Sequence, residues 1–130
     1  MKVLISTTGG AFAVDLETDA VEPWAGEVEP SPDPVLNLPR VLAAAAAGAT
    51  IAAVVDAKPP LLVSYDAGAT WRESGRGLPA GRAVAISDAN PDLIVYAGRN
   101  RLFVSRNGGV FWSSLAVELP AIEALTFAGS

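Results

Sequence analysis

A turn-like sequence occurs twice in this chain, and the repetition limits what the chain can fold into. "LLVSYDAGATWRE" occupies residues 61–73, and "LFVSRNGGVFWSS" follows 41 positions later, at residues 102–114. The residues that recur without a gap form four pairs: Ser64 and Ser105, Asp66 and Asn107, Gly68 and Gly109, and Trp71 and Trp112. Self-similarity at a fixed period indicates a fold built from repeated supersecondary units.

A second marker has the same period. Leucine–proline pairs stand at Leu38-Pro39, Leu78-Pro79 and Leu119-Pro120, and each pair precedes a short apolar run. The spacings of these pairs, 40 and then 41 residues, match the spacing of the turn-like sequence. Two independent markers therefore indicate a repeating unit of about 40 residues.

Each unit reads as four short strands. In the clearest unit, residues 82–87, 93–97, 101–105 and 110–115 form apolar or alternating runs, separated by turn-forming Asn, Asp, Pro and Gly residues. We read the alanine-rich run after Pro39 as a strand as well, because Gly48 and the β-branched residues after it disfavour a helix. Four strands in about 40 residues are typical of a β-propeller blade, so we predict an all-β chain.

The repeated motif resembles the Asp-box of bacterial-neuraminidase-type (BNR) repeats. The pattern Ser-x-Asp-x-Gly-x-Thr-Trp is complete at residues 64–71, including Thr70, whereas Asn107 and Phe111 replace the acid and the threonine in the second copy. The resemblance implies a hairpin turn between the third and fourth strands of a propeller blade.

Elementary chemistry suits that structural role. The short polar side chains of Asp66 and Asn107 can accept hydrogen bonds from the amides of the turn. Gly68 and Gly109 permit positive φ, and the tryptophans can bury a large ring while the indole N–H finds a carbonyl. We therefore interpret the Asp-box residues as residues that form the fold rather than a ligand site.

The first unit lacks its innermost strand, which reappears at the other end of the chain. Residues 3–6 and 11–16 align with the second and third strands of the clearest unit, and residues 122–130 supply a strand beyond the third Leu-Pro pair. We predict one domain over residues 1–130. Its first blade comprises residues 1–24 plus 121–130, its second blade residues 40–74, and its third blade residues 81–115.

Three blades are fewer than the four to eight of known propellers. Two chains that exchange their C-terminal strands would form a six-bladed ring with twofold symmetry, so we predict a homodimer through strand exchange at the termini. A fragment of a longer chain is the competing explanation for the missing strand.

Propeller ligands usually bind where the loops between strands two and three meet the links between blades. In this register the candidate ligand-binding residues at that end are Arg40, Arg76, Arg82 and Arg99. Lys58 lies there too, and the opposing acids are Glu27, Glu29 and Asp33. Such a mixed set could hold a small anion or a sugar; the alternative is a rim of solvated charges.

Composition removes several classes of function. The sequence has no cysteine and no histidine, which excludes disulfides, Cys/His zinc sites and imidazole or thiolate catalysis. The net charge of −5 argues against nucleic acid and anionic membranes as partners. We find no phosphate-binding loop, secretory signal or membrane span, and expect a cytoplasmic protein without metal or cofactor.

We predict that the chain is not an enzyme. Sialidases belong to the fold family that the Asp-box resemblance implies. They hold the substrate carboxylate with three arginines and attack the substrate with a tyrosine–glutamate pair. The tyrosines of this chain, Tyr65 and Tyr96, have no glutamate at a suggestive spacing. The prediction is a non-catalytic binding or scaffolding module for a protein or glycan. The alternatives are a lectin that uses Trp24 and Phe12, and a glycoside hydrolase.

Overall fold

β-Strands and connecting turns make up the part of the chain that the structure describes, and this part contains no helix. The structure is a computed structural model that describes residues 1–29, 34, 36 and 38–128. The strands are β1 (Lys2–Thr7), β2 (Gly10–Asp15), β3 (Val21–Pro23), β4 (Val41–Ala47), β5 (Thr50–Val55), β6 (Leu61–Ser64), β7 (Arg72–Ser74), β8 (Ala83–Ile86), β9 (Ile94–Ala97), β10 (Arg101–Ser105), β11 (Ser113–Glu118) and β12 (Ile122–Phe127). The all-β prediction is confirmed.

The strands form three four-stranded antiparallel sheets. The first sheet has the order β12-β1-β2-β3, the second β4-β5-β6-β7 and the third β8-β9-β10-β11. The second and third sheets are simple meanders of consecutive strands, as the 41-residue repeat predicts. Three sheets of four strands therefore agree with the three predicted units.

The first sheet is completed by the end of the chain. β12 pairs antiparallel with β1, so that Val3 lies opposite Phe127 and Ile5 opposite Leu125. The structure contains a single chain, so both strands belong to it, and the expected exchange of β12 with a second chain stays a prediction. Residues 129–130, at the end of the predicted strand, lie outside the described residues.

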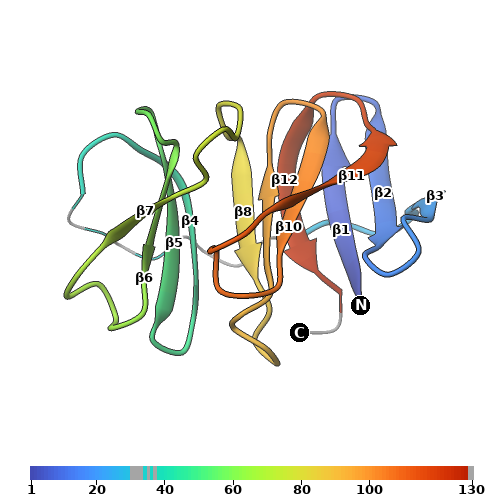
Figure 1. Ribbon diagram of the computed structural model, residues 1–130. Coiled ribbons are helices and arrows are strands. Elements are labelled where there is room, and N and C mark those ends of the chain that lie inside the picture. The colour runs from blue at the N-terminus through green and yellow to red at the C-terminus, as the bar shows by residue number, and fades with distance from the viewer. Residues whose placement is uncertain (30–33, 35, 37, 129–130) are drawn as a thin grey trace.

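The third sheet lies between the other two. β8 contacts β4 on one side and β12 on the other, and Figure 1 shows the second, third and first sheets side by side in that order. These three contacting strands are the inner strands of their sheets, and β3, β7 and β11 are the outer ones. The inner strands converge while the sheets fan outward, as in an arc of propeller blades.

Two hydrophobic cores fill the spaces between the sheets. The core between the second and third sheets includes Val54, Val63 and Tyr96, and the core between the third and first sheets includes Ile5 and Leu102. Successive residues of the third sheet belong to opposite cores, because side chains alternate along a strand. The third sheet is therefore buried on both faces, and the other two have one face each in a core.

The alanine-rich run forms the inner strand β4, as predicted. Alanine has low strand propensity, but β4 packs against the neighbouring inner strand β8, and methyl side chains allow the two backbones to approach closely. Tertiary packing thus decides the conformation of this segment.

The fourth strands begin later than the sequence patterns suggested. β7 starts at Arg72 and β11 at Ser113, in each case directly after the tryptophan of the repeated motif. The residues before each tryptophan belong to the turn, because side-chain hydrogen bonds hold them there.

Candidate functional site

The first repeated motif forms a hydrogen-bonded turn between β6 and β7. The Ser64 hydroxyl donates to Asp66 Oδ1 at 2.8 Å and accepts from the Gly68 amide at 2.8 Å. Asp66 Oδ1 also accepts from the Thr70 amide at 2.8 Å, and Asp66 Oδ2 accepts from the Thr70 hydroxyl at 2.5 Å. Ala67 and Gly68 have positive φ, as this tight turn requires.

The second motif repeats this network between β10 and β11. Ser105 donates to Asn107 Oδ1 at 2.9 Å and accepts from the Gly109 amide at 2.8 Å. The Phe111 amide donates to Asn107 Oδ1 at 3.0 Å, and Phe111 cannot add the hydroxyl bond that Thr70 supplies in the first turn. The side-chain amide oxygen of Asn107 therefore takes the place of the Asp66 carboxylate, and the turn loses one hydrogen bond, the one from the threonine hydroxyl.

The hydrogen bonds of the first turn lower the pKa of the Asp66 carboxyl group. The Thr70 hydroxyl, followed by the Thr70 amide and the Ser64 hydroxyl, lowers the pKa of Asp66 from 3.8 to about 2. Donors directed at a carboxylate favour its charged form. Asp66 is therefore a structural acceptor rather than a group that exchanges protons near neutral pH.

The two tryptophans of the motif differ in their surroundings. The Trp112 indole N–H donates to the Gly109 carbonyl at 3.1 Å and to Ser74 Oγ of the second sheet at 3.2 Å. Its ring meets Tyr96 edge-on, with centroids 6.1 Å apart. Trp71 is half-buried on the face of the second sheet that points away from the third sheet, and its indole N–H has no hydrogen-bond partner among the described residues.

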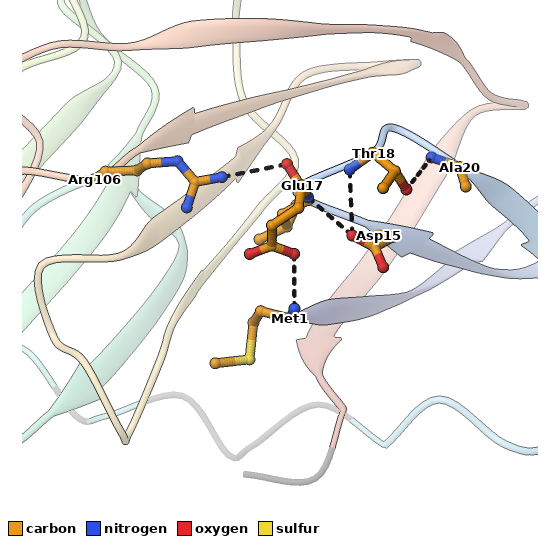
Figure 2. A network of polar contacts seen from close by, with 7 residues as sticks. Met1, Asp15, Glu17, Thr18, Ala20 and Arg106 are labelled. Carbon is orange, nitrogen blue, oxygen red and sulfur yellow. Dashed lines mark hydrogen bonds and ion pairs between the residues drawn. The ribbon is translucent and has the colours of Figure 1, made fainter.

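The residue after the motif serine connects each sheet to the next one. The Tyr65 hydroxyl donates to the Gly108 carbonyl, joining the second sheet to the third. Arg106, 41 positions later, donates from its guanidinium to the Leu16 carbonyl at 3.2 Å, joining the third sheet to the first (Figure 2). The sequence analysis did not single out this position for its role. The sequence signal for this role is that a long side chain with a hydrogen-bond donor stands at both Tyr65 and Arg106.

The first sheet carries a turn of the same length without the motif. The cross-strand pairs Val63–Arg72, Val104–Ser113 and Ala13–Glu22 each enclose the same number of residues. Aligning the sheets on these pairs places Phe12 with Phe103, one residue away from the sequence alignment. The motif positions of the first sheet, from serine to tryptophan, are then occupied by Val14, Leu16, Thr18, Ala20 and Val21.

A different hydrogen-bond pattern holds this third turn (Figure 2). Asp15 Oδ1 accepts from the amides of Glu17 at 2.9 Å and Thr18 at 3.3 Å, and the Glu17 bond is the main cause that lowers the pKa of Asp15. Glu17 also forms an ion pair with the Met1 amino group at 2.8 Å. The turn thus keeps its shape without the motif residues.

Both tyrosines have structural hydrogen bonds. The Tyr65 hydroxyl is bonded to Gly108, and the Tyr96 hydroxyl donates to the Pro79 carbonyl at 2.5 Å. The Tyr96 side chain is fully buried, and its burial raises its pKa from 10.0 to about 12. Both phenols thus join separate segments of the fold through their hydrogen bonds.

The inner strands enclose a groove with small side chains, which we name the inner groove. It has a volume of about 300 Å³ and is lined by residues 42–46, 82–86 and 123–127, with Pro34 and Asp88. Alanine is the commonest residue of the walls, and the charged side chains Arg82, Asp88 and Glu123 are exposed. This groove occupies the place that the inner strands of a propeller give to the central channel.

A larger hollow, which we name the loop hollow, lies beside the second sheet. It measures about 990 Å³ and is bordered by residues 56–60 of the β5–β6 loop and by Glu73 and residues 76–80 of the β7–β8 link. Arg76 stands exposed between Gly75 and Gly77, whose positive φ values form the tight turn. The structure therefore brings together two of the loops that the sequence analysis assigned to the ligand face.

The four predicted ligand-binding arginines share one end of the sheets but not one site. Arg82 lines the inner groove and Arg76 the loop hollow, whereas Arg40 and Arg99 line neither. Among the described residues, none of the four guanidinium groups forms an ion pair or a side-chain hydrogen bond. Of the acids expected to oppose them, Glu27 and Glu29 are exposed, and Asp33 lies outside the described residues.

The aromatic residues of the lectin hypothesis differ in accessibility. Trp24 is 39% exposed, and its indole N–H donates to the Glu27 carbonyl at 3.4 Å. Phe12 packs against the core between the first and third sheets, so that only part of its ring is accessible. Trp24 is therefore the better placed of the two for a sugar ring.

The described part of the chain contains neither a candidate metal cluster nor a helix that could span a membrane. No group of three or more carboxylates gathers there in a way that could hold a metal ion. No helix of the length and apolar character needed to cross a membrane occurs in the same residues.

Comparison with known proteins supports the fold alone. No protein-family model and no curated protein matches the sequence. Among solved structures, the Niastella koreensis GH74 enzyme is similar, with a TM-score of 0.52 and 22% identity over 91% of this chain. The match spans 18% of the enzyme's length. The chain thus has a β-propeller-like fold and resembles in structure a small part of a glycoside hydrolase.

Proposed function

We propose that this chain is a non-catalytic binding module that forms half of a six-bladed ring, the second half being another copy of the same chain. The ring would present the loop ends of its blades to a ligand. Three observations support the proposal. The fold is β-propeller-like, the three sheets form an arc with two end faces, and the hollows show no recognisable arrangement of catalytic residues among the described residues.

The surroundings of Trp71 carry the proposal. Trp112, at the same motif position, is held by Ser74 of the neighbouring second sheet, whereas the second sheet makes its main inter-sheet contacts with the third sheet, on the opposite face from Trp71. Trp71 therefore stands half-buried on an end face with its indole N–H unbonded among the described residues. A further blade packed there would give Trp71 the environment that Trp112 already has.

The end faces suit a second copy. The second sheet contributes Ile51 and Ala53 to its end face, and the first sheet contributes Leu4 and Ala13. All four are small or aliphatic, and all are already buried in the single chain at 0–9% exposure, so a second copy would touch the side chains that cover them. Two copies related by a twofold axis would cover both pairs of end faces with the same contact, made twice.

The ligand would bind at the loop end. The loop hollow combines the charges of Asp56, Lys58, Glu73 and Arg76 with proline and leucine walls, which suits a small anion or a sugar.

Light scattering coupled to size-exclusion chromatography tests the assembly. We expect about twice the 13.3 kDa mass of one chain at micromolar concentration. Trp71→Ala should give the monomer mass, and Phe111→Ala, a change at an exposed aromatic residue of the central third sheet, should leave the dimer intact. A monomeric wild-type chain, or equal effects of the two variants, would contradict the proposal.

A disulfide distinguishes an exchanged from an unexchanged dimer, because the chain has no cysteine of its own. Leu4 and Thr126 are cross-strand partners in β1 and β12, so cysteines at both positions lie within disulfide reach. Following the structure, we expect the oxidised double variant to migrate as a monomer on a non-reducing denaturing gel. A covalent dimer would show strand exchange.

Binding and turnover are measured separately. We expect a glycan array or a set of small anions to show binding that Arg76→Gln weakens, and we expect no hydrolysis of fluorogenic glycosides. Hydrolysis that is lost on mutation of Asp56 or Glu73 would replace the proposal with the glycoside hydrolase alternative.

A further inference from the structure

The two seams between the sheets are built differently at their outer ends. In the seam between the second and third sheets, the Trp112 indole fills the space beside Gly109. Its neighbours there include Val63 and Ser74: a Cβ added to Gly109 would lie 3.4 Å from Val63, 3.1 Å from Ser74 and 3.7 Å from the Trp112 ring. This seam is closed by one aromatic ring.

The seam between the third and first sheets lacks that ring. Val21 occupies the tryptophan position of the first sheet and is 37% exposed. Val104 and Leu115, the counterparts of Val63 and Ser74 at the 41-residue spacing, line a hollow of about 320 Å³. We name it the seam hollow, and it lies where the missing indole would be expected.

The lining of the seam hollow combines apolar walls with one cation. Leu16, Val104 and Leu115 form the apolar part, and Phe111, 75% exposed, provides a free aromatic face. Arg106 also lines the hollow. One of its guanidinium nitrogens bonds the Leu16 carbonyl (Figure 2), and no carboxylate among the described residues pairs with it.

We propose that the seam hollow binds a small planar aromatic carboxylate. The ring would take the place of the absent indole, against Leu115 and the face of Phe111. The carboxylate would accept hydrogen bonds from the remaining donors of Arg106, whose planar fork suits a carboxylate. Small-molecule sites begin at about 300 Å³, which suits a ligand of one or two fused rings.

This site lies within one chain, so it does not depend on the proposed dimer. Indole-3-acetate is the probe, and amide chemical shifts and titration calorimetry are the measurements. We expect shifts confined to residues around the hollow and saturable binding. Neutral indole and the variant Arg106→Gln, which retains a donor for the Leu16 carbonyl, should each weaken binding by about tenfold or more.

The variant Val21→Trp tests the location directly. A tryptophan at this position restores the motif residue, so it should occupy the hollow and abolish binding of indole-3-acetate. Leu42→Trp, in the inner groove, adds the same side chain elsewhere and should leave binding unchanged. Absence of saturable binding to the folded wild-type chain, or undiminished binding to both Val21→Trp and Arg106→Gln, would overturn the proposal.

Discussion

Replacing each motif tryptophan with phenylalanine compares two copies of one motif in two environments. Trp112 lies between two sheets and donates two hydrogen bonds, to Gly109 and Ser74. Trp71 lies on an end face and donates none to the described residues. The same substitution therefore removes different interactions at positions that the sequence alone makes equivalent.

The expected costs follow from the contacts. Trp112→Phe retains a ring near Tyr96 but loses both bonds of the indole N–H, and the Gly109 carbonyl keeps the hydroxyl of Ser74 as a donor at 2.6 Å. No buried carbonyl is left unbonded, so the hydrogen-bond loss is about 1–2 kcal/mol. The smaller ring loses packing worth about 1 kcal/mol more. We expect about 2–3 kcal/mol for Trp112→Phe, and less than about 1 kcal/mol for Trp71→Phe in the isolated chain.

Urea unfolding followed by circular dichroism measures both free energies. The protein should be diluted until light scattering shows monomers, so that dimer contacts do not add to the stability of the Trp71 variant. Unchanged denaturant slopes would show that the variants unfold as the wild type does. Equal destabilisation by the two substitutions in the monomer would refute the reasoning, because it would mean that the two indoles have equivalent surroundings.

Two further predictions concern pH. Asp66 has a folded-state pKa of about 2, below its ordinary 3.8, so its contribution to stability is complete above pH 3.8 and is lost as the pH falls through about 2. Asp66→Asn should remove this part of the stability loss in acid. Urea unfolding midpoints between about pH 5 and about pH 2 measure the difference. Tyr96 has a folded-state pKa of about 12, above its ordinary 10.0, so its contribution is complete below pH 10.0 and is lost as the pH rises through about 12. Tyr96→Phe should remove this alkaline loss and cost about 1 kcal/mol at neutral pH, because the Pro79 carbonyl loses its donor. A phenolate absorbance titration of a Tyr65→Phe variant that shows Tyr96 ionising near pH 10 would contradict the assignment.

The repeat made the sheets predictable from the sequence. Motif spacing gave the strand count of the second and third sheets, and the Leu-Pro spacing identified residues 122–127 as the missing inner strand. These features depend on local turn chemistry and on apolar patterns, both of which a sequence displays directly. The first sheet was aligned one residue off, because it has Leu16 and Val21 where the motif has Asp and Trp.

The chain that supplies β12 to the first sheet cannot be predicted in the same way. An antiparallel ladder has the same hydrogen bonds whether its two strands belong to one chain or to two. The choice depends on the path of the link between β3 and β4, and residues 30–33, 35 and 37 of that link lie outside the described residues. The apolar pattern of β12 specifies its register on β1 but not the chain that supplies it.

The arginine set shows another limit of sequence reasoning. The register placed Arg40, Arg76, Arg82 and Arg99 at one end of the sheets. Convergence into one site depends on how far the sheets fan apart and where each side chain turns, which strand patterns do not report. Tyr65 and Arg106 lay inside the repeated motif, but the motif pattern marks their positions as variable, and their role between sheets appears only in three dimensions.

The loss of the motif from the first sheet is explained by the packing of its seam. β4 packs against β8 with alanines, so the second and third sheets approach closely at their inner edge. β12 instead brings Leu125 and Phe127 into the core shared with the third sheet, and Ile5 lies beside Leu125. These larger side chains supply apolar burial that the other seam obtains partly from Trp112, at about 25 cal/mol per Å². With stability provided at the inner end of the seam, the outer end is free to lose its indole, and the seam hollow is the consequence.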